Sequence, residues 1–117
     1  TATTELISAP IARLFGIDQL VATRPATVDG VEGAPFTGEI DGEPCYRQHK
    51  VTRVNDWLAM QPPGSRRSLA EFGQSWFYSD AMGDLPLLGV VTHPVVVCPD
   101  ERLRAHALQS GWPVLDL

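Results

Sequence analysis

The sequence has 117 residues, of which 44% are apolar, and its formal net charge is −5. This length fits one domain, or part of one, with enough apolar residues for a core. The acidic balance argues against nucleic-acid binding, because no basic stripe is available to meet phosphates, and no apolar run reaches the ~18 residues of a membrane span. Cys45 and Cys98 show no metal-binding spacing, so we interpret them as reduced thiols of a cytoplasmic protein.

The first predicted element is a helix that runs to about Phe15. Thr3 or Thr4 can cap its start, where an acidic residue follows in the first turn. Pro10 falls inside this helix and is expected to kink it, and Gly16 is expected to end it. Residues 18–23 (DQLVAT) are predicted to form a short strand.

The next segment is rich in glycine, proline and acidic residues. We expect residues 28–45 to form a hairpin or loop excursion with Phe36 to Ile40 as one arm. Its turns are expected at the Asp-Gly pairs 29–30 and 41–42, because this dipeptide favours tight hairpin turns. The acids of this excursion are expected to be solvated.

A second helix is predicted over Tyr46 to Met60. Val51, Val54 and Leu58 fall on one face of it, with the spacing that is typical of an amphipathic helix. Lys50 lies near the start of this helix, and the Pro-Pro-Gly sequence that follows Met60 is expected to end it. On its own, Lys50 would be interpreted as a solvated helix residue.

The stretch from 76 to 88 (WFYSDAMGDLPLL) joins an apolar run to two acids. The run predicts a buried parallel strand that ends near Ser79 and Asp80. Ligands of open α/β sheets bind beyond the carboxyl ends of the strands, and Asp84 follows Asp80 closely enough to share one hard cation. An alternative explains the same residues by a strand, a turn and Asp84 as the N-cap of a helix with Pro86 in its first turn.

The C-terminal part continues the alternation of strands and helices. Residues 95–97 are almost purely β-branched and predict a strand. A last helix is expected to open at Pro99 and to end at Gly111, and residues 113–115 are expected to form a final strand or tail. Such alternation indicates parallel βαβ units in a sheet of three or four strands. Few helices remain to cover both sheet faces, so the domain is expected to be incomplete.

Several of these segments together resemble one enzyme family. The segment SDxxxDLPLL, a lysine on an earlier helix and the Thr-x-Thr at 1–3 are similar to motifs of the haloacid dehalogenase superfamily. More narrowly, the chain resembles the phosphoserine-phosphatase-like branch, subfamily IB, over nearly all of its length. Further segments that carry this resemblance are APIARLFGI at 9–17, FTGEIDGEPC at 36–45 and GWPVLDL at 111–117.

The resemblance implies a Rossmann-like α/β fold with a parallel sheet and flanking helices. In such enzymes an aspartate attacks a phosphate ester, and water then cleaves the aspartyl-phosphate, with Mg²⁺ neutralising the phosphoryl oxygens. The resemblance implies that Asp80 ligates Mg²⁺ and that Asp84 completes the site, through the metal or by fixing the lysine. Lys50 would neutralise the charges of nucleophile and phosphate, and Thr1, or alternatively Thr3, would hydrogen-bond a phosphoryl oxygen.

The sequence also departs from the pattern of that family. The motif Asp-x-Asp-x-Thr, which supplies the nucleophile and the general acid, is absent, and so is the helical cap between the first two motifs. Residues 1–117 are therefore interpreted as the C-terminal part of the core domain of such a hydrolase. Gly83 stands where relatives commonly carry Asn, and His49 stands where a glycine is common.

The leading hypothesis is a Mg²⁺-dependent phosphatase that acts on a small phosphorylated substrate and whose nucleophile lies outside this chain. The rival hypothesis is a non-catalytic α/β module that binds metal or phosphate, or a subunit that a second polypeptide completes. Either way, a missing N-terminal half or partner segment is expected.

Overall fold

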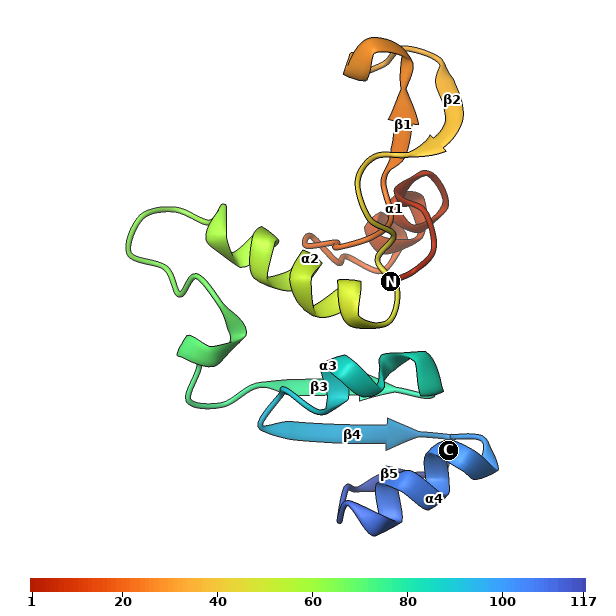
Figure 1. Cartoon of the computed structure of the whole chain (residues 1–117), viewed down its shortest axis with the longest axis vertical. Coiled ribbons are helices and arrows are strands. Elements are labelled where there is room, and N and C mark those ends of the chain that lie inside the picture. The colour runs from red at the N-terminus through yellow and green to blue at the C-terminus, as the bar shows by residue number, and fades with distance from the viewer. The chain divides into compact units, whose positions relative to one another are not determined.

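A computed structural model describes all 117 residues, and the chain divides into two compact units, Thr1–Arg53 and Val54–Leu117. The division falls within helix α2 (Gln48–Ala59). Figure 1 labels the elements of each unit. No helix has the length and the apolar character that crossing a membrane requires.

The first unit opens with helix α1 (Glu5–Leu14), as predicted. Thr4 occupies the N-cap position with extended backbone, although its side chain makes no capping hydrogen bond. Pro10 lies inside the helix, which nevertheless continues to Leu14. Gly16 ends it with a positive φ of 66°, and the amide of Ile17 donates back to the carbonyl of Ala12 at 2.8 Å. This pattern of positive φ and backward hydrogen bond is the glycine stop that the sequence indicated.

The strand predicted over residues 18–23 does not form, and this prediction was wrong. Only Thr23 pairs, through an isolated parallel bridge to Thr4. The amide of Glu5 donates to the carbonyl of Thr23 at 2.8 Å. A strand exists only where a partner supplies a ladder of hydrogen bonds, and within these residues only Thr4 pairs with this segment.

A two-stranded antiparallel ribbon follows, formed by β1 (Pro25–Thr27) and β2 (Phe36–Ile40). The bounds of β2 are those predicted for the hairpin arm, and every residue of β2 is exposed. The 3₁₀ turn η1 (Val28–Gly30) lies between the strands, where Asp29 has a positive φ of 55°. Asparagine and aspartate tolerate this backbone region better than most residues do, which explains the predicted turn.

The second unit is built on a parallel sheet with strand order β3-β4-β5. The strands are β3 (Trp76–Ser79), β4 (His93–Val97) and β5 (Val114–Leu115). Tyr78 lies opposite Val95 in one pair, and Val96 lies opposite Val114 in the other. The sequence predicted β3 and β4, although β4 begins two residues earlier than the β-branched run, and it left the region of β5 open between a strand and a tail.

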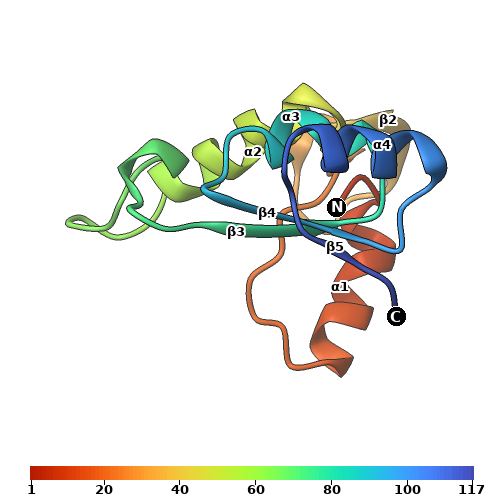
Figure 2. The ribbon, with the colours of Figure 1, turned by 90° about the horizontal axis from the view of Figure 1, so that it is seen from below.

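Both crossover helices of this unit lie on the same side of its three strands (Figure 2). These helices are α3 (Leu85–Leu88) and α4 (Glu101–Gln109). Parallel crossovers are right-handed, and strands added in one direction therefore place successive helices on one face. Leu88, Val96 and Leu103 are fully buried between these helices and the sheet. Truncating such a leucine to alanine typically costs about 2–5 kcal/mol of stability.

The opposite face of this sheet carries exposed aromatic residues. Trp76 and Tyr78 are 52% and 57% exposed, and Leu115 is 43% exposed. The indole of Trp76 stacks on the imidazole of His93, with 4.5 Å between ring centroids. A parallel sheet normally has both faces covered, so this arrangement is an incomplete layer structure, as the sequence predicted.

Candidate functional site

Two acids follow the carboxyl end of β3. Asp80 comes directly after the last strand residue, Ser79, and is exposed. Asp84 ends the short 3₁₀ helix η3 (Met82–Asp84) and is 7% exposed. Because η3 folds back from the strand, the hydroxyl of Ser79 reaches Asp84 and donates a hydrogen bond of 2.6 Å to its Oδ2 atom.

This turn is held by further hydrogen bonds between neighbouring residues. The Ser79 hydroxyl accepts the amide of Ala81 at 3.1 Å, and the carbonyl of Ala81 accepts the amide of Asp84 at 3.0 Å. Asp84 also holds the N-cap position of α3, but its side chain makes no capping hydrogen bond. The alternative interpretation of Asp84 as a conventional side-chain cap therefore finds no support, since its carboxylate bonds Ser79 instead.

The oxygen donors at this strand end suit a small hard cation. Mg²⁺ is usually bound by one or two carboxylates, with waters and substrate phosphate completing its octahedron. Asp80 and Asp84 offer such carboxylates at one turn. No group of three or more His, Cys, Asp or Glu side chains that could hold a metal ion occurs in the chain. Any further protein ligands of a metal ion would have to come from outside this turn.

The Thr-x-Thr segment at residues 1–3, which we call the hydroxyl motif, lies in the first unit before α1. The amide of Thr3 donates to the Oγ1 atom of Thr1 at 3.2 Å. Accepting this bond leaves the hydroxyl proton of Thr1 available to a phosphoryl oxygen. Both threonines are exposed, so their hydroxyl groups are open to a ligand.

Thr23 anchors this motif and was missed in the sequence. Its side chain is buried, and its hydroxyl donates to the carbonyl of Ala2 at 2.8 Å while accepting the amide of Cys45 at 2.9 Å. One hydroxyl thus holds together the segment before α1 and both ends of the hairpin. The only available signal was the polar residue that closes the apolar run Leu-Val-Ala at 20–22, a pattern too common to be diagnostic.

Lys50 is the third residue of α2 and the only lysine in the chain. It is partly buried, which differs from the solvated position expected of an ordinary helix lysine. The helix itself is tied to the first unit by Arg53, whose guanidinium donates to the carbonyl of Ala22 at 2.6 Å. Lys50 is therefore carried by an anchored helix.

Comparison with protein families gives a match that covers most of the chain. Residues 1–89 match the haloacid dehalogenase-like hydrolases. The chain belongs to this family. All five residues singled out in the sequence, at 1, 3, 50, 80 and 84, lie within the matched part of this haloacid dehalogenase-like hydrolase, and their roles remain predictions.

Two relatives of this haloacid dehalogenase-like chain are named as phosphatases. It is 40% identical over 116 residues to a histidinol-phosphatase from Neisseria meningitidis, covering 99% of this chain and 49% of the relative. It is 33% identical over 116 residues to a phosphoserine phosphatase from Mycobacterium tuberculosis, covering 99% and 34%. The chain thus spans half or less of the length of these relatives.

A solved structure gives the same result for the fold. A crystal structure of a protein of unknown function from Bordetella pertussis is 44% identical, with a TM-score of 0.83. The match covers 97% of this chain and 47% of that protein. The predicted α/β, Rossmann-like architecture of a haloacid dehalogenase-like hydrolase, with part of the sheet absent, is confirmed by this likeness.

Proposed function

We propose that the whole protein is a Mg²⁺-dependent phosphomonoesterase to which this chain contributes the hydroxyl, lysine and acidic motifs. The observation that carries the proposal is the Ser79–Asp84 turn, which presents two carboxylates beyond the carboxyl end of a parallel strand in a member of this hydrolase family. Strand ends of this kind are where α/β proteins bind their ligands.

Each proposed residue has a role that its chemistry suits. Asp80 and Asp84 would hold Mg²⁺, which when bound neutralises the charge on the phosphoryl oxygens. The hydroxyl of Thr1, or alternatively that of Thr3, donates a hydrogen bond to a phosphoryl oxygen. Lys50 supplies a compact positive charge that offsets the repulsion between an attacking carboxylate and the phosphate. Ser79 is a positioning residue, because it fixes the orientation of the Asp84 carboxylate.

The nucleophile is proposed to come from outside these residues. The chain has no pair of aspartates separated by one residue. Transfer through an aspartyl-phosphate requires a carboxylate in line with phosphorus, and positioning supplies most of the catalysis. Because both acids of the turn are assigned to the metal, a further aspartate in the rest of the protein is expected to attack the ester.

The substrate is proposed to be a small phosphate monoester. The names of the relatives specify histidinol phosphate in one case and phosphoserine in the other. These two compounds differ in shape, so the relatives support the class of phosphate monoesters and do not select one member of it.

The test is an assay of the whole protein with 4-nitrophenyl phosphate, with and without Mg²⁺. We expect turnover that chelation abolishes and Mg²⁺ restores. Lys50→Ala should lower kcat by about 10²-fold or more, since it removes charge that acts in the transition state. The matched control is Arg13→Ala, which removes one positive charge from the exposed end of α1. Absence of metal-dependent turnover, or equal effects of the two substitutions, would overturn the proposal.

A further inference from the structure

A hollow lies in the first unit between the start of α1 and the β1–β2 ribbon. Its volume is about 320 Å³, within the range of small-molecule sites. We call it the hairpin pocket. It is lined by Glu5, Leu6, Arg24, Pro25, Thr27, Glu32, Gly33 and Phe36. The lining combines an apolar wall with three charged side chains, which is the composition of a site that holds a small polar molecule in one orientation.

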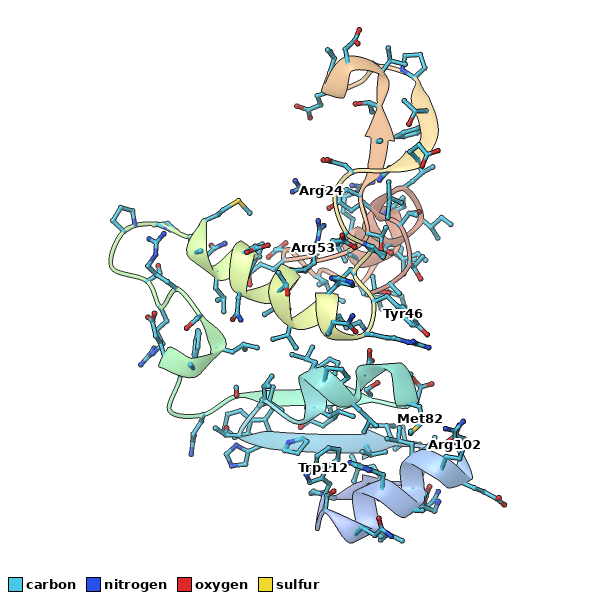
Figure 3. The ribbon with its side chains drawn as sticks, in the orientation of Figure 1. Arg24, Tyr46, Arg53, Met82, Arg102 and Trp112 are labelled. Atoms are coloured by element: carbon cyan, nitrogen blue, oxygen red, sulfur yellow. The ribbon has the colours of Figure 1, made fainter.

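The hairpin pocket lies next to the hydroxyl motif. Glu5 lines the pocket, and Thr3 precedes it by two residues, so the Cα atoms of Thr3 and Glu5 are at most about 7 Å apart. Thr23 holds the hydroxyl motif and the pocket together. Its carbonyl accepts the amide of Glu5, and its hydroxyl donates to the carbonyl of Ala2. The following residue, Arg24, lies at the base of the ribbon (Figure 3).

The charges of the pocket do not balance. The guanidinium of Arg24 pairs with the carboxylate of Glu5, with 3.2 Å between Nε and Oε1. Glu32, on the loop between β1 and β2, makes no ion pair or side-chain hydrogen bond. Glu32 is exposed, so its carboxylate is solvated and is also open to a ligand, and a primary ammonium is the kind of group that would pair with it.

We infer that the hairpin pocket receives the alcohol part of the phosphate ester and that Glu32 selects alcohols that carry an amino group. This inference rests on the proposed function, since it takes the phosphoryl group to be held at the hydroxyl motif. A small ester anchored there extends over the first turn of α1 into the pocket. Its carbon chain then lies against Leu6 and Phe36, and its ammonium meets the Glu32 carboxylate.

The experiment compares two esters of similar size in the whole protein, O-phosphoethanolamine and ethyl phosphate. Glu32→Gln should reduce the ratio of their kcat/KM values about fivefold, a change of ~1 kcal/mol, the upper range for a solvent-exposed ion pair. The matched control is Glu39→Gln, because Glu39 lies on β2 with the same charge but does not line the pocket. The control should leave this ratio unchanged.

A charge reversal provides the second measurement. Glu32→Lys should raise the kcat/KM of phosphoglycolate, which carries a carboxylate in place of the amine, relative to that of ethyl phosphate. If wild-type protein hydrolyses the esters but neither Glu32 variant changes these ratios, the pocket assignment is overturned while the phosphatase proposal stands. If wild-type protein hydrolyses no phosphate monoester, the proposed function fails first and the inference fails with it.

Discussion

The hydroxyl of Ser79 and the carboxylate of Asp84 form a buried hydrogen bond of 2.6 Å across the turn that follows β3. A hydrogen bond to a charged group contributes more than one between neutral groups, and a buried acceptor that loses its donor is costly. The turn that presents the acidic motif is thus also a stability element of the second unit.

We expect Ser79→Ala to lower the free energy of unfolding by about 1–2 kcal/mol, because the buried Asp84 carboxylate loses a donor. The measurement is urea denaturation of the whole protein followed by circular dichroism. Ser110→Ala is the matched control, since Ser110 is exposed at the end of α4. Equal midpoints for both variants would show that the bond contributes nothing to stability.

Asp80→Asn should weaken Mg²⁺ binding by the whole protein at least about tenfold, because the ion loses a charged ligand while the side-chain size is kept. Isothermal titration calorimetry measures the affinity directly and does not depend on turnover. Asp56→Asn, an exposed acid on α2, serves as the control. The same Mg²⁺ affinity in the Asp80 variant as in wild type would exclude this residue as a metal ligand.

Asp116 should titrate below the ordinary range for an aspartate. Two hydrogen bonds from the Arg104 guanidinium, of 3.0 and 2.5 Å, lower the pKa of Asp116, and the same contact raises the pKa of Arg104. A lowered pKa in the folded state means that the pair stabilises the fold above the ordinary aspartate pKa, and that this contribution is lost as the pH falls through the lowered value. Both side chains are exposed, so the effect on overall stability is small.

The Asp116 shift can be measured by following its carboxyl carbon in an NMR titration. Arg104→Gln should return the pKa of Asp116 toward its ordinary value. Arg102→Gln removes the same charge from an exposed position of α4 and should leave it lowered. If the Arg104 variant titrates like wild type, another group causes the shift.

Residues 1–117 expressed alone should show no phosphatase activity. The chemical reason is our proposal that the attacking carboxylate lies outside these residues. The physical reason is the exposed sheet face around Trp76 and Tyr78, which favours aggregation. The measurements are an assay with 4-nitrophenyl phosphate and Mg²⁺ and a thermal melt. A soluble fragment that melts cooperatively and shows turnover lost in Asp80→Asn would refute the assignment of a nucleophile outside this chain.

Local sequence patterns predicted most elements of the fold, because the burial of apolar residues and the capping of helices produce both the pattern and the structure. The β-branched run at 95–97 lies in β4, where Val95 and Val96 are buried, and Asp100 caps α4 by accepting the amide of Leu103 at 2.8 Å. The strand prediction for residues 18–23 was wrong for a different reason. Their apolar run has strand propensity, but a strand requires a neighbour, and sequence pattern carries no information on whether that neighbour is present.

The candidate site was predictable in part. The order of the motifs in the sequence identified the candidate residues of the site. It did not predict the hydrogen bonds that hold these residues in place. The hydroxyl groups of Ser79 and Thr23 donate hydrogen bonds to partners that lie 5 and 21 residues away in the chain. No periodicity specifies such bonds. Glu32 likewise became a candidate only when the ribbon placed it in the same hollow as Glu5 and Arg24.

The fluorescence of a tryptophan on the uncovered side of the β3-β4-β5 sheet can report whether another segment covers that side. Trp76 lies on that side at 52% exposure, whereas Trp112 packs against the buried core. Indole emission moves to shorter wavelength when water is removed from around the ring. A segment that covers this face should therefore shift the emission of Trp76 and leave that of Trp112 in place. Fluorescence of single-tryptophan variants can then record when the sheet is completed.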